Sequence, residues 1–260
     1  PSYGAMHRVA LAPCSPFSVS GDLLRESADL ARSLGVRLHT HVAETRDEEQ
    51  FTLEKYGLRP LAYLHSLGWT GPDVWYAHGI WFNDAELRLL ADTGTGVAHC
   101  PASNMKLASG VCRVPEMRKL GVPVGLAVDG AASNDGSSLL EEMRVCYLLH
   151  RLHSSAAAPT GYDVLKMATR GSARLLGRDD LGQLAPGKAA DFFLVNLERL
   201  GLVGAQFDPM SMLGTVGFPG SVDYTVVGGV PVVQQGELTT MDETELVLKA
   251  NQVVRRYLGR

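Results

Sequence analysis

Short apolar runs alternate with helical patterns along the first half of the sequence, and this alternation constrains the fold more than any other feature. The runs lie at residues 7–12, 36–42, 74–78, 96–100 and 123–128, and a helix-like segment follows each of them. Continuous apolar strands separated by helices are typical of a parallel sheet with both faces covered. We therefore predict a parallel α/β architecture for this part of the chain.

Most of these runs end at a residue that can bind a metal or move a proton. The second run ends at His41, with Glu44 three residues later, and the next three end near His78, His99 and Asp129. The carboxyl ends of parallel strands meet at one rim, where reactive groups are usually found. We expect these side chains to converge there.

The residue types at this rim suit a metal-dependent hydrolase. Neutral imidazole and carboxylate are ligands that zinc accepts, and a catalytic zinc keeps a position for water. The metal lowers the pKa of that water to about 7. A carboxylate such as Glu44 can move protons beside the ion, which is usually worth about a hundredfold or more in rate. Structural alternatives stay open, because Glu44 also suits the first turn of a helix and Asp129 also suits a turn before Gly130.

Other histidines have a structural interpretation. His39 shares one strand face with His41, because side chains alternate along a strand. We interpret it as a supporting residue beside the metal site. Taken singly, His65, His99 and His150 are more typical of hydrogen-bonded residues than of ligands.

The pattern changes in the second half of the sequence. A polar loop at 130–136 leads to helices predicted at 137–152 and 163–175. Turn residues at 182–187, a strand at 190–195 and a hairpin at 222–233 then predict a separate β element. We predict a barrel domain over residues 1–180, a small β-sandwich portion over 181–241 and a closing helix over 242–260.

Composition narrows the function classes. A net charge of -4 without a basic run argues against nucleic acid as a partner. No apolar run approaches the roughly 20 residues that a membrane span needs, so we predict no membrane partner. The four cysteines form no Cys-x-x-Cys pair, which argues against a disulfide framework and for a reducing, cytoplasmic location.

Several motifs resemble those of the amidohydrolase superfamily, in its branch of deaminases and triazine hydrolases. The resemblance covers nearly the whole chain. It rests on residues 41–45 (HVAET), 75–79 (WYAHG), 99–107 (HCPASNMKL), 128–134 (VDGAASN) and 182–191 (GQLAPGKAAD). It implies the carboxy-terminal part of a (β/α)8 TIM-type barrel, about strands four to eight, followed by half of a small β-sandwich.

The same resemblance implies roles for individual residues. His41 and Asp129 would bind one Zn²⁺ per chain, with Fe²⁺ as the alternative ion. Glu44 would pass protons to the ring nitrogen and the departing amine, and His78 would orient the water. Asp129 would also accept the water's proton. The superfamily adds two ligands from a His-x-His motif after the first barrel strand, and nothing before His7 can supply them.

The implied reaction is hydrolytic deamination of a purine-type base, with release of ammonia. The loop at residues 12–19 brings the sequence nearest to superfamily members that act on 8-oxoguanine. An s-triazine or guanine/cytosine-type hydrolase is the alternative within the superfamily. A catalytically inert module that binds a heterocycle or a partner protein is the alternative from a different class. The expected partners are a small heterocyclic substrate and further copies of the chain in a homo-oligomer.

Overall fold

The computed structural model describes residues 6–218 and 220–260. The chain divides into two compact units. The first comprises the residues up to Gln183 together with Asp208–Phe218, and the second comprises Leu184–Phe207 together with the residues from 220 onward.

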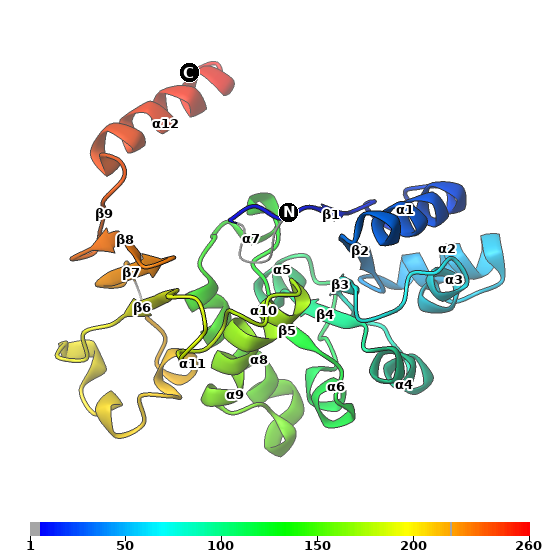
Figure 1. Ribbon diagram of the computed structural model, residues 1–260, viewed down its shortest axis with the longest axis horizontal. Helices are drawn as coiled ribbons and strands as arrows, with labels where there is room; N and C mark the ends of the chain where they lie inside the picture. The colour runs from blue at the N-terminus through cyan, green and yellow to red at the C-terminus, as the bar shows by residue number, and fades with distance from the viewer. Residues whose placement is uncertain (1–5, 219) are drawn as a thin grey trace. The chain divides into compact units, whose positions relative to one another are not determined.

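A five-stranded sheet forms the centre of the first unit (Figure 1). Its strands lie in sequence order: β1 (Ala10–Leu11), β2 (Arg37–Val42), β3 (Val74–His78), β4 (Gly96–His99) and β5 (Val124–Leu126). All four neighbouring pairs are parallel. The predicted parallel α/β architecture is therefore confirmed, although β1 and β5 are shorter than their apolar runs. Because strands run parallel and in order, their carboxyl ends lie along one edge.

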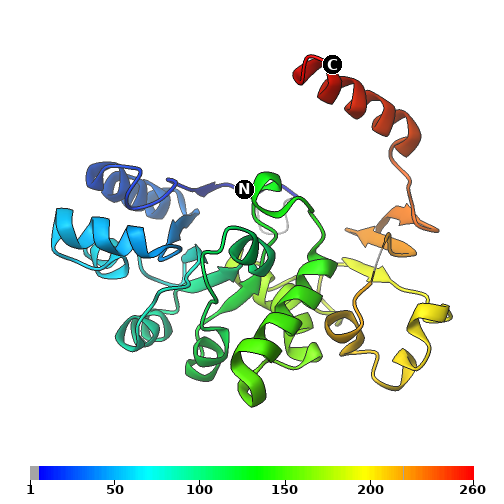
Figure 2. The same ribbon diagram turned by 180° about the vertical axis from the view of Figure 1, so that it is seen from behind.

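Helices follow the strands, as the alternating pattern predicts. They are α1 (Gly21–Leu34), α2 (Arg46–Tyr56), α3 (Pro60–Ser66), α4 (Asp84–Thr93), α5 (Pro101–Lys106), α6 (Val114–Leu120), α7 (Ala131–Asn134), α8 (Leu139–Ser154), α9 (Gly161–Lys166), α10 (Ser172–Leu175) and α11 (Met212–Thr215). In Figures 1 and 2, α4, α6 and α8 lie below the strands. None of the described helices is long and apolar enough to cross a membrane.

The core of this unit lies between the sheet and its helices. Leu38, Tyr76 and Val97 of the strands are fully buried, as are Leu24 of α1 and Leu90 of α4. Burying side chains of this size contributes roughly 1.5–3 kcal/mol each. The packed core fixes the strands, and hence the positions of the groups at their ends.

Three segments depart from the sequence prediction. The stretch at 130–136, predicted as a loop, contains α7, and α5 forms around Asn104 and Lys106, where the sequence suggests a polar loop. The helix predicted over 163–175 is interrupted by a π-helix at Met167–Gly171. There the chain packs against the backbone of β5, since a Cβ on Gly171 would lie 2.2 Å from the Val124 carbonyl oxygen. The wider turn accommodates this contact, and Ser172 Oγ donates to the Leu126 carbonyl at 2.9 Å.

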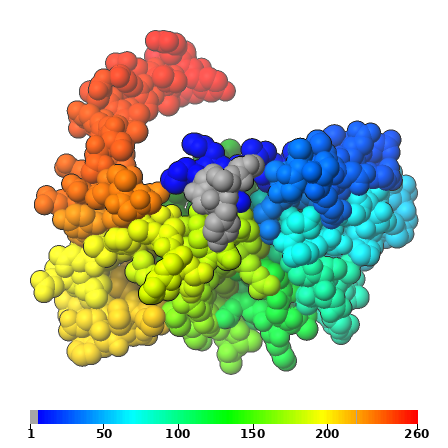
Figure 3. Space-filling model, in the orientation of Figure 1, coloured from blue at the N-terminus to red at the C-terminus, as the bar shows by residue number. Residues whose placement is uncertain are grey.

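The second unit contains an antiparallel sheet in the order β6 (Phe192–Leu194), β7 (Tyr224–Val227), β8 (Val230–Gln234) and β9 (Glu237–Leu238). The predicted strand and hairpin are confirmed, and β9 was not predicted. Helix α12 (Glu243–Tyr257) follows and has no buried residue. Figure 3 shows it standing clear of the strands of its own unit.

Candidate metal centre

The backbone turns sharply where three of the parallel strands end. Ala43 follows β2, His78 ends β3, and Asp129 lies three residues after β5. Their φ angles are 52°, 67° and 63°. A residue other than glycine seldom adopts this left-handed conformation, which costs energy and occurs preferentially at functional sites. The strained positions coincide with the rim that the sequence predicts as the site.

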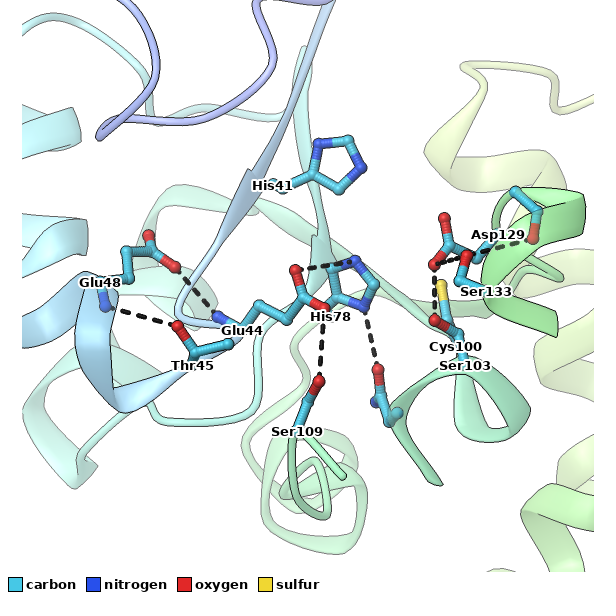
Figure 4. A network of polar contacts seen from close by, with 12 residues as sticks. His41, Glu44, Thr45, Glu48, His78, Cys100, Ser103, Ser109, Asp129 and Ser133 are labelled. Carbon is cyan, nitrogen blue, oxygen red and sulfur yellow. Dashed lines mark hydrogen bonds and ion pairs between the residues drawn. The ribbon is translucent and has the colours of Figure 1, made fainter. Parts of the chain in front are cut away.

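Three of the predicted residues converge at this rim. His41, His78 and Asp129 each offer one ligand atom, and these atoms lie within 4.8 Å of one another. We call these residues the rim set. Figure 4 shows them facing a common space, with Glu44 beside His78. His41 and Asp129 are partly exposed, whereas His78 is buried.

Hydrogen bonds fix both imidazoles of the rim set. His41 Nδ1 lies 2.7 Å from the carbonyl oxygen of Cys14 and can only donate to it. His78 Nδ1 lies 2.9 Å from Asn104 Oδ1. With the proton on Nδ1, each neutral ring keeps its Nε2 lone pair available for a cation or a water proton.

Two serines hold the carboxylate of Asp129. Ser103 and Ser133 donate to its Oδ2 at 2.6 and 3.0 Å. Burial alone would raise the pKa of Asp129, but these hydrogen bonds and one from the Gly130 amide outweigh it, so the pKa falls below its usual value. An ionised carboxylate with two oriented imidazoles is a donor set that fits zinc.

Glu44 is positioned beside the rim set rather than within it. Ser109 Oγ donates to its Oε1 at 3.3 Å, and its Oε2 lies 3.6 Å from His78 Nε2. Its backbone amide donates to the buried carboxylate of Glu48, where burial raises the pKa to about 7. The Thr45 side chain caps the start of α2 by accepting from the Glu48 amide, and the Glu48 side chain accepts from the Glu44 amide.

A single segment, residues 101–110, supports three of the predicted groups. Ser103 contacts Asp129, Asn104 contacts His78, and Ser109 contacts Glu44. The sequence prediction assigned none of these three. A signal was present, because Pro101 directly after a strand end favours a helix start. That start places the next polar side chains at the rim.

The remaining histidines lie apart from the rim set. His39 stacks on Trp75 with ring centroids 4.9 Å apart, on the same strand face as His41. His99 groups with Cys146 and His150 of α8, and all three side chains are fully buried. We call His99, Cys146 and His150 the core set. Nε2 of His99 and Nε2 of His150 are 3.3 Å apart, a distance at which two neutral imidazoles share one hydrogen bond.

Comparison with known proteins adds three findings. Residues 2–232 match the amidohydrolase family. The chain is 49% identical over 246 residues to 8-oxoguanine deaminase of Pseudomonas aeruginosa, covering 95% of this chain and 54% of that protein. It is 48% identical over 257 residues to hydroxydechloroatrazine ethylaminohydrolase of Pseudomonas sp. strain ADP, covering 98% and 53%.

A solved structure is also similar to this chain. Atrazine chlorohydrolase from Arthrobacter aurescens TC1, complexed with zinc, superposes with a TM-score of 0.93 at 32% identity, over 98% of this chain and 56% of that one. The chain thus spans about half the length of the proteins it matches.

Proposed function

Because this chain belongs to the amidohydrolase family, we propose that it carries the metal centre of an enzyme that deaminates a purine-type base by hydrolysis. We name 8-oxoguanine as the first substrate, since a deaminase of that base is 49% identical. The observation that carries the proposal is the convergence of His41, His78 and Asp129, with Glu44 beside them.

We further propose how the two units fit the family's architecture. The five parallel strands are assigned to strands four to eight of a (β/α)8 barrel, within residues 1–180. Residues 181–241 are assigned to part of a small β-sandwich, and residues 242–260 to a closing helix. The parallel order of β1 to β5 supports the first assignment.

His41 and Asp129 are the residues that would hold one zinc ion, with Fe²⁺ as the alternative. A bound zinc lowers the pKa of water to about 7 and so supplies a nucleophile near neutral pH. The free Nε2 of His41 and the ionised carboxylate of Asp129 suit this role. The two further histidines implied by the sequence resemblance stay a prediction.

The other groups move protons. Asp129 accepts a proton from the attacking water through Oδ1, because Ser103 and Ser133 occupy Oδ2. His78, with its Nδ1 proton held by Asn104, orients that water through Nε2. The water supplies both protons that the reaction needs. Glu44 carries one to the ring nitrogen as the carbon–oxygen bond forms, and the one accepted by Asp129 passes through Glu44 to the amine as the carbon–nitrogen bond breaks and ammonia leaves. Groups placed in this way typically contribute about 10²–10⁴ in rate each.

A second candidate within the family is hydrolysis of an s-triazine. The relative named for that chemistry is 48% identical to this chain, and the deaminase is 49% identical, so the two identities are almost the same. The machinery would be shared, and the leaving group would differ. A homo-oligomeric state and a cytoplasmic location stay predictions from the sequence.

One experiment separates these candidates. Zinc content and product release are measured on the full-length protein with 8-oxoguanine, guanine, isocytosine and an N-ethylamino-s-triazine, with Asp129→Asn as the control. Zinc together with ammonia release from the oxopurine supports the proposal. Ethylamine release from the triazine alone would select the second candidate. A folded protein that binds 8-oxoguanine without zinc or product would overturn both and favour an inert binding module.

A further inference from the structure

The two donors to Asp129 lie on very short helices. Ser103 belongs to the six-residue α5, and Ser133 belongs to the four-residue α7. Helices of this length have little stability of their own. The hydrogen bonds of 2.6 and 3.0 Å to Asp129 Oδ2 therefore require that other groups hold α5 and α7 in place.

Glu142 contacts both helices at the residues beside these serines. It lies in α8 and is 2% exposed. Its Oε2 accepts from the Ala102 amide at 3.2 Å, and its Oε1 accepts from Asn134 Nδ2 at 2.5 Å. Asn134 Nδ2 also donates to the Val128 carbonyl at 2.7 Å, directly before Asp129. Two carboxylates, Asp129 and Glu142, thus bind the same two helices at adjacent residues.

A role in stabilising α8 does not explain Glu142. An acidic residue near a helix start interacts favourably with the helix dipole, but the exposed Glu141 provides that without burial. Burial raises the pKa of Glu142, which reflects the cost of desolvating its charge, and the two hydrogen bonds lower it only in part. The hydrogen bonds that Glu142 accepts from Ala102 and Asn134 therefore explain why a carboxylate is buried at this position.

We propose that Glu142 is a positioning residue, which fixes α5 and α7 so that Ser103 and Ser133 hold one oxygen of Asp129 and leave the other for the reaction. The inference rests on the proposed role of Asp129. It adds to that role a residue that touches neither metal nor substrate.

The test compares Glu142→Ala and Glu142→Gln with the matched control Glu141→Gln in the full-length protein. For Glu142→Ala we expect kcat to fall about 10–100-fold with KM changed little, as for other groups that orient a metal site. The kcat of Glu142→Gln should lie between those of Glu142→Ala and the wild type, because the amide oxygen can accept only one of the two hydrogen bonds. Glu141→Gln should match the wild type. Wild-type kcat in both Glu142 variants would overturn the proposal.

Amide hydrogen exchange gives a readout that needs no turnover. In Glu142→Gln, exchange should rise in residues 101–106 and 131–134 while the rest of the first unit stays protected. A uniform rise would overturn the proposal, because it would indicate general destabilisation. A wild-type protein without ammonia release would overturn the proposed function alone, since the exchange pattern is measured without substrate.

The most specific test combines Glu142→Ala with substitutions of the two serines and asks whether the losses of activity add. In a Ser103→Ala/Ser133→Ala background, Glu142→Ala should cost little further activity, because residues that act through one another do not lose rate additively. An undiminished loss in that background would mean that Glu142 acts by another route and would overturn the proposal.

Discussion

The rim set and the core set hold similar donor atoms in very different surroundings. In the rim set, His41, His78 and Asp129, a protein hydrogen bond holds one atom of each side chain, and the second nitrogen of His78 lies 3.6 Å from Glu44. In the core set, the buried Nδ1 atoms of His99 and His150 have no hydrogen-bond partner among the described residues. Its two imidazoles meet through their Nε2 atoms, which lie 3.3 Å apart.

This difference shows what donor atoms need besides proximity. Metal-binding histidines usually donate their second nitrogen to a protein acceptor, which fixes the tautomer. His41 and His78 satisfy this condition, and the core set does not. Access differs too, since the core set is fully buried while His41 and Asp129 are partly open. We therefore expect changes in the rim set to affect metal and turnover, and changes in the core set to affect stability.

The largest effect is expected for Asp129→Asn. The substitution removes the charge of the proposed ligand and the proposed proton acceptor, so turnover should fall about 10⁴-fold or more. The fold should persist, because the amide oxygen can still accept from Ser103 and Ser133. Ammonia release and thermal unfolding measure the two properties. Near-normal turnover would remove Asp129 from the site.

Glu44→Gln should cost about 10²–10⁴ in rate while zinc stays bound. Glu44 lies 3.6 Å from His78 Nε2 but is not part of the rim set, so with the proposed roles its loss removes proton transfer and leaves the metal ligands in place. Rate and zinc content are compared with Glu54→Gln, an exposed glutamate of α2, the helix that begins two residues after Glu44. Loss of zinc from Glu44→Gln would show instead that Glu44 is a ligand.

The sequence predicted the strands and the convergence at their ends because both follow from local patterns. An apolar run shows a buried strand, and parallel strands in order bring His41, His78 and Asp129 to one edge. His99 also ends a strand, yet it points to α8. His99 is the last residue of β4, and its Nε2 lies 3.3 Å from Nε2 of His150. A pattern of apolar runs does not determine toward which side the side chain at a strand end turns.

The supporting residues could not be predicted in the same way. Ser103, Ser109 and Ser133 lie in segments that read as polar loops, and their partners are 4 to 65 residues away. Glu142 lies on a helix whose pattern does not distinguish it from Glu141. Such contacts depend on how separate elements pack, which a pattern in a single sequence does not record.

We expect acid to lower the free energy of unfolding through the core set, and in particular through His150. Burial lowers the pKa of His150 to about 4, against 6.5 for a free imidazole. The unfolded chain therefore binds the proton first, and His150 contributes stability above about pH 6.5 that is lost as the pH falls toward 4. The loss is at most about 3 kcal/mol. Denaturant unfolding at several pH values measures the slope of the unfolding free energy against pH, and His150→Asn should make this slope smaller. An unchanged slope would mean that His150 is not the source.

The smallest effect is expected for Cys146→Ala, which tests whether the core set binds metal at all. The thiol is fully buried, and burial raises its pKa to about 12, so it stays protonated. Removing it should cost about 1 kcal/mol for the lost packing and leave zinc content and turnover unchanged. His41→Ala is the matched change in the rim set and should lose the zinc. If Cys146→Ala lost zinc while His41→Ala kept it, the core set and not the rim set would be the metal site. The metal would then lie against α8 instead of at the strand ends.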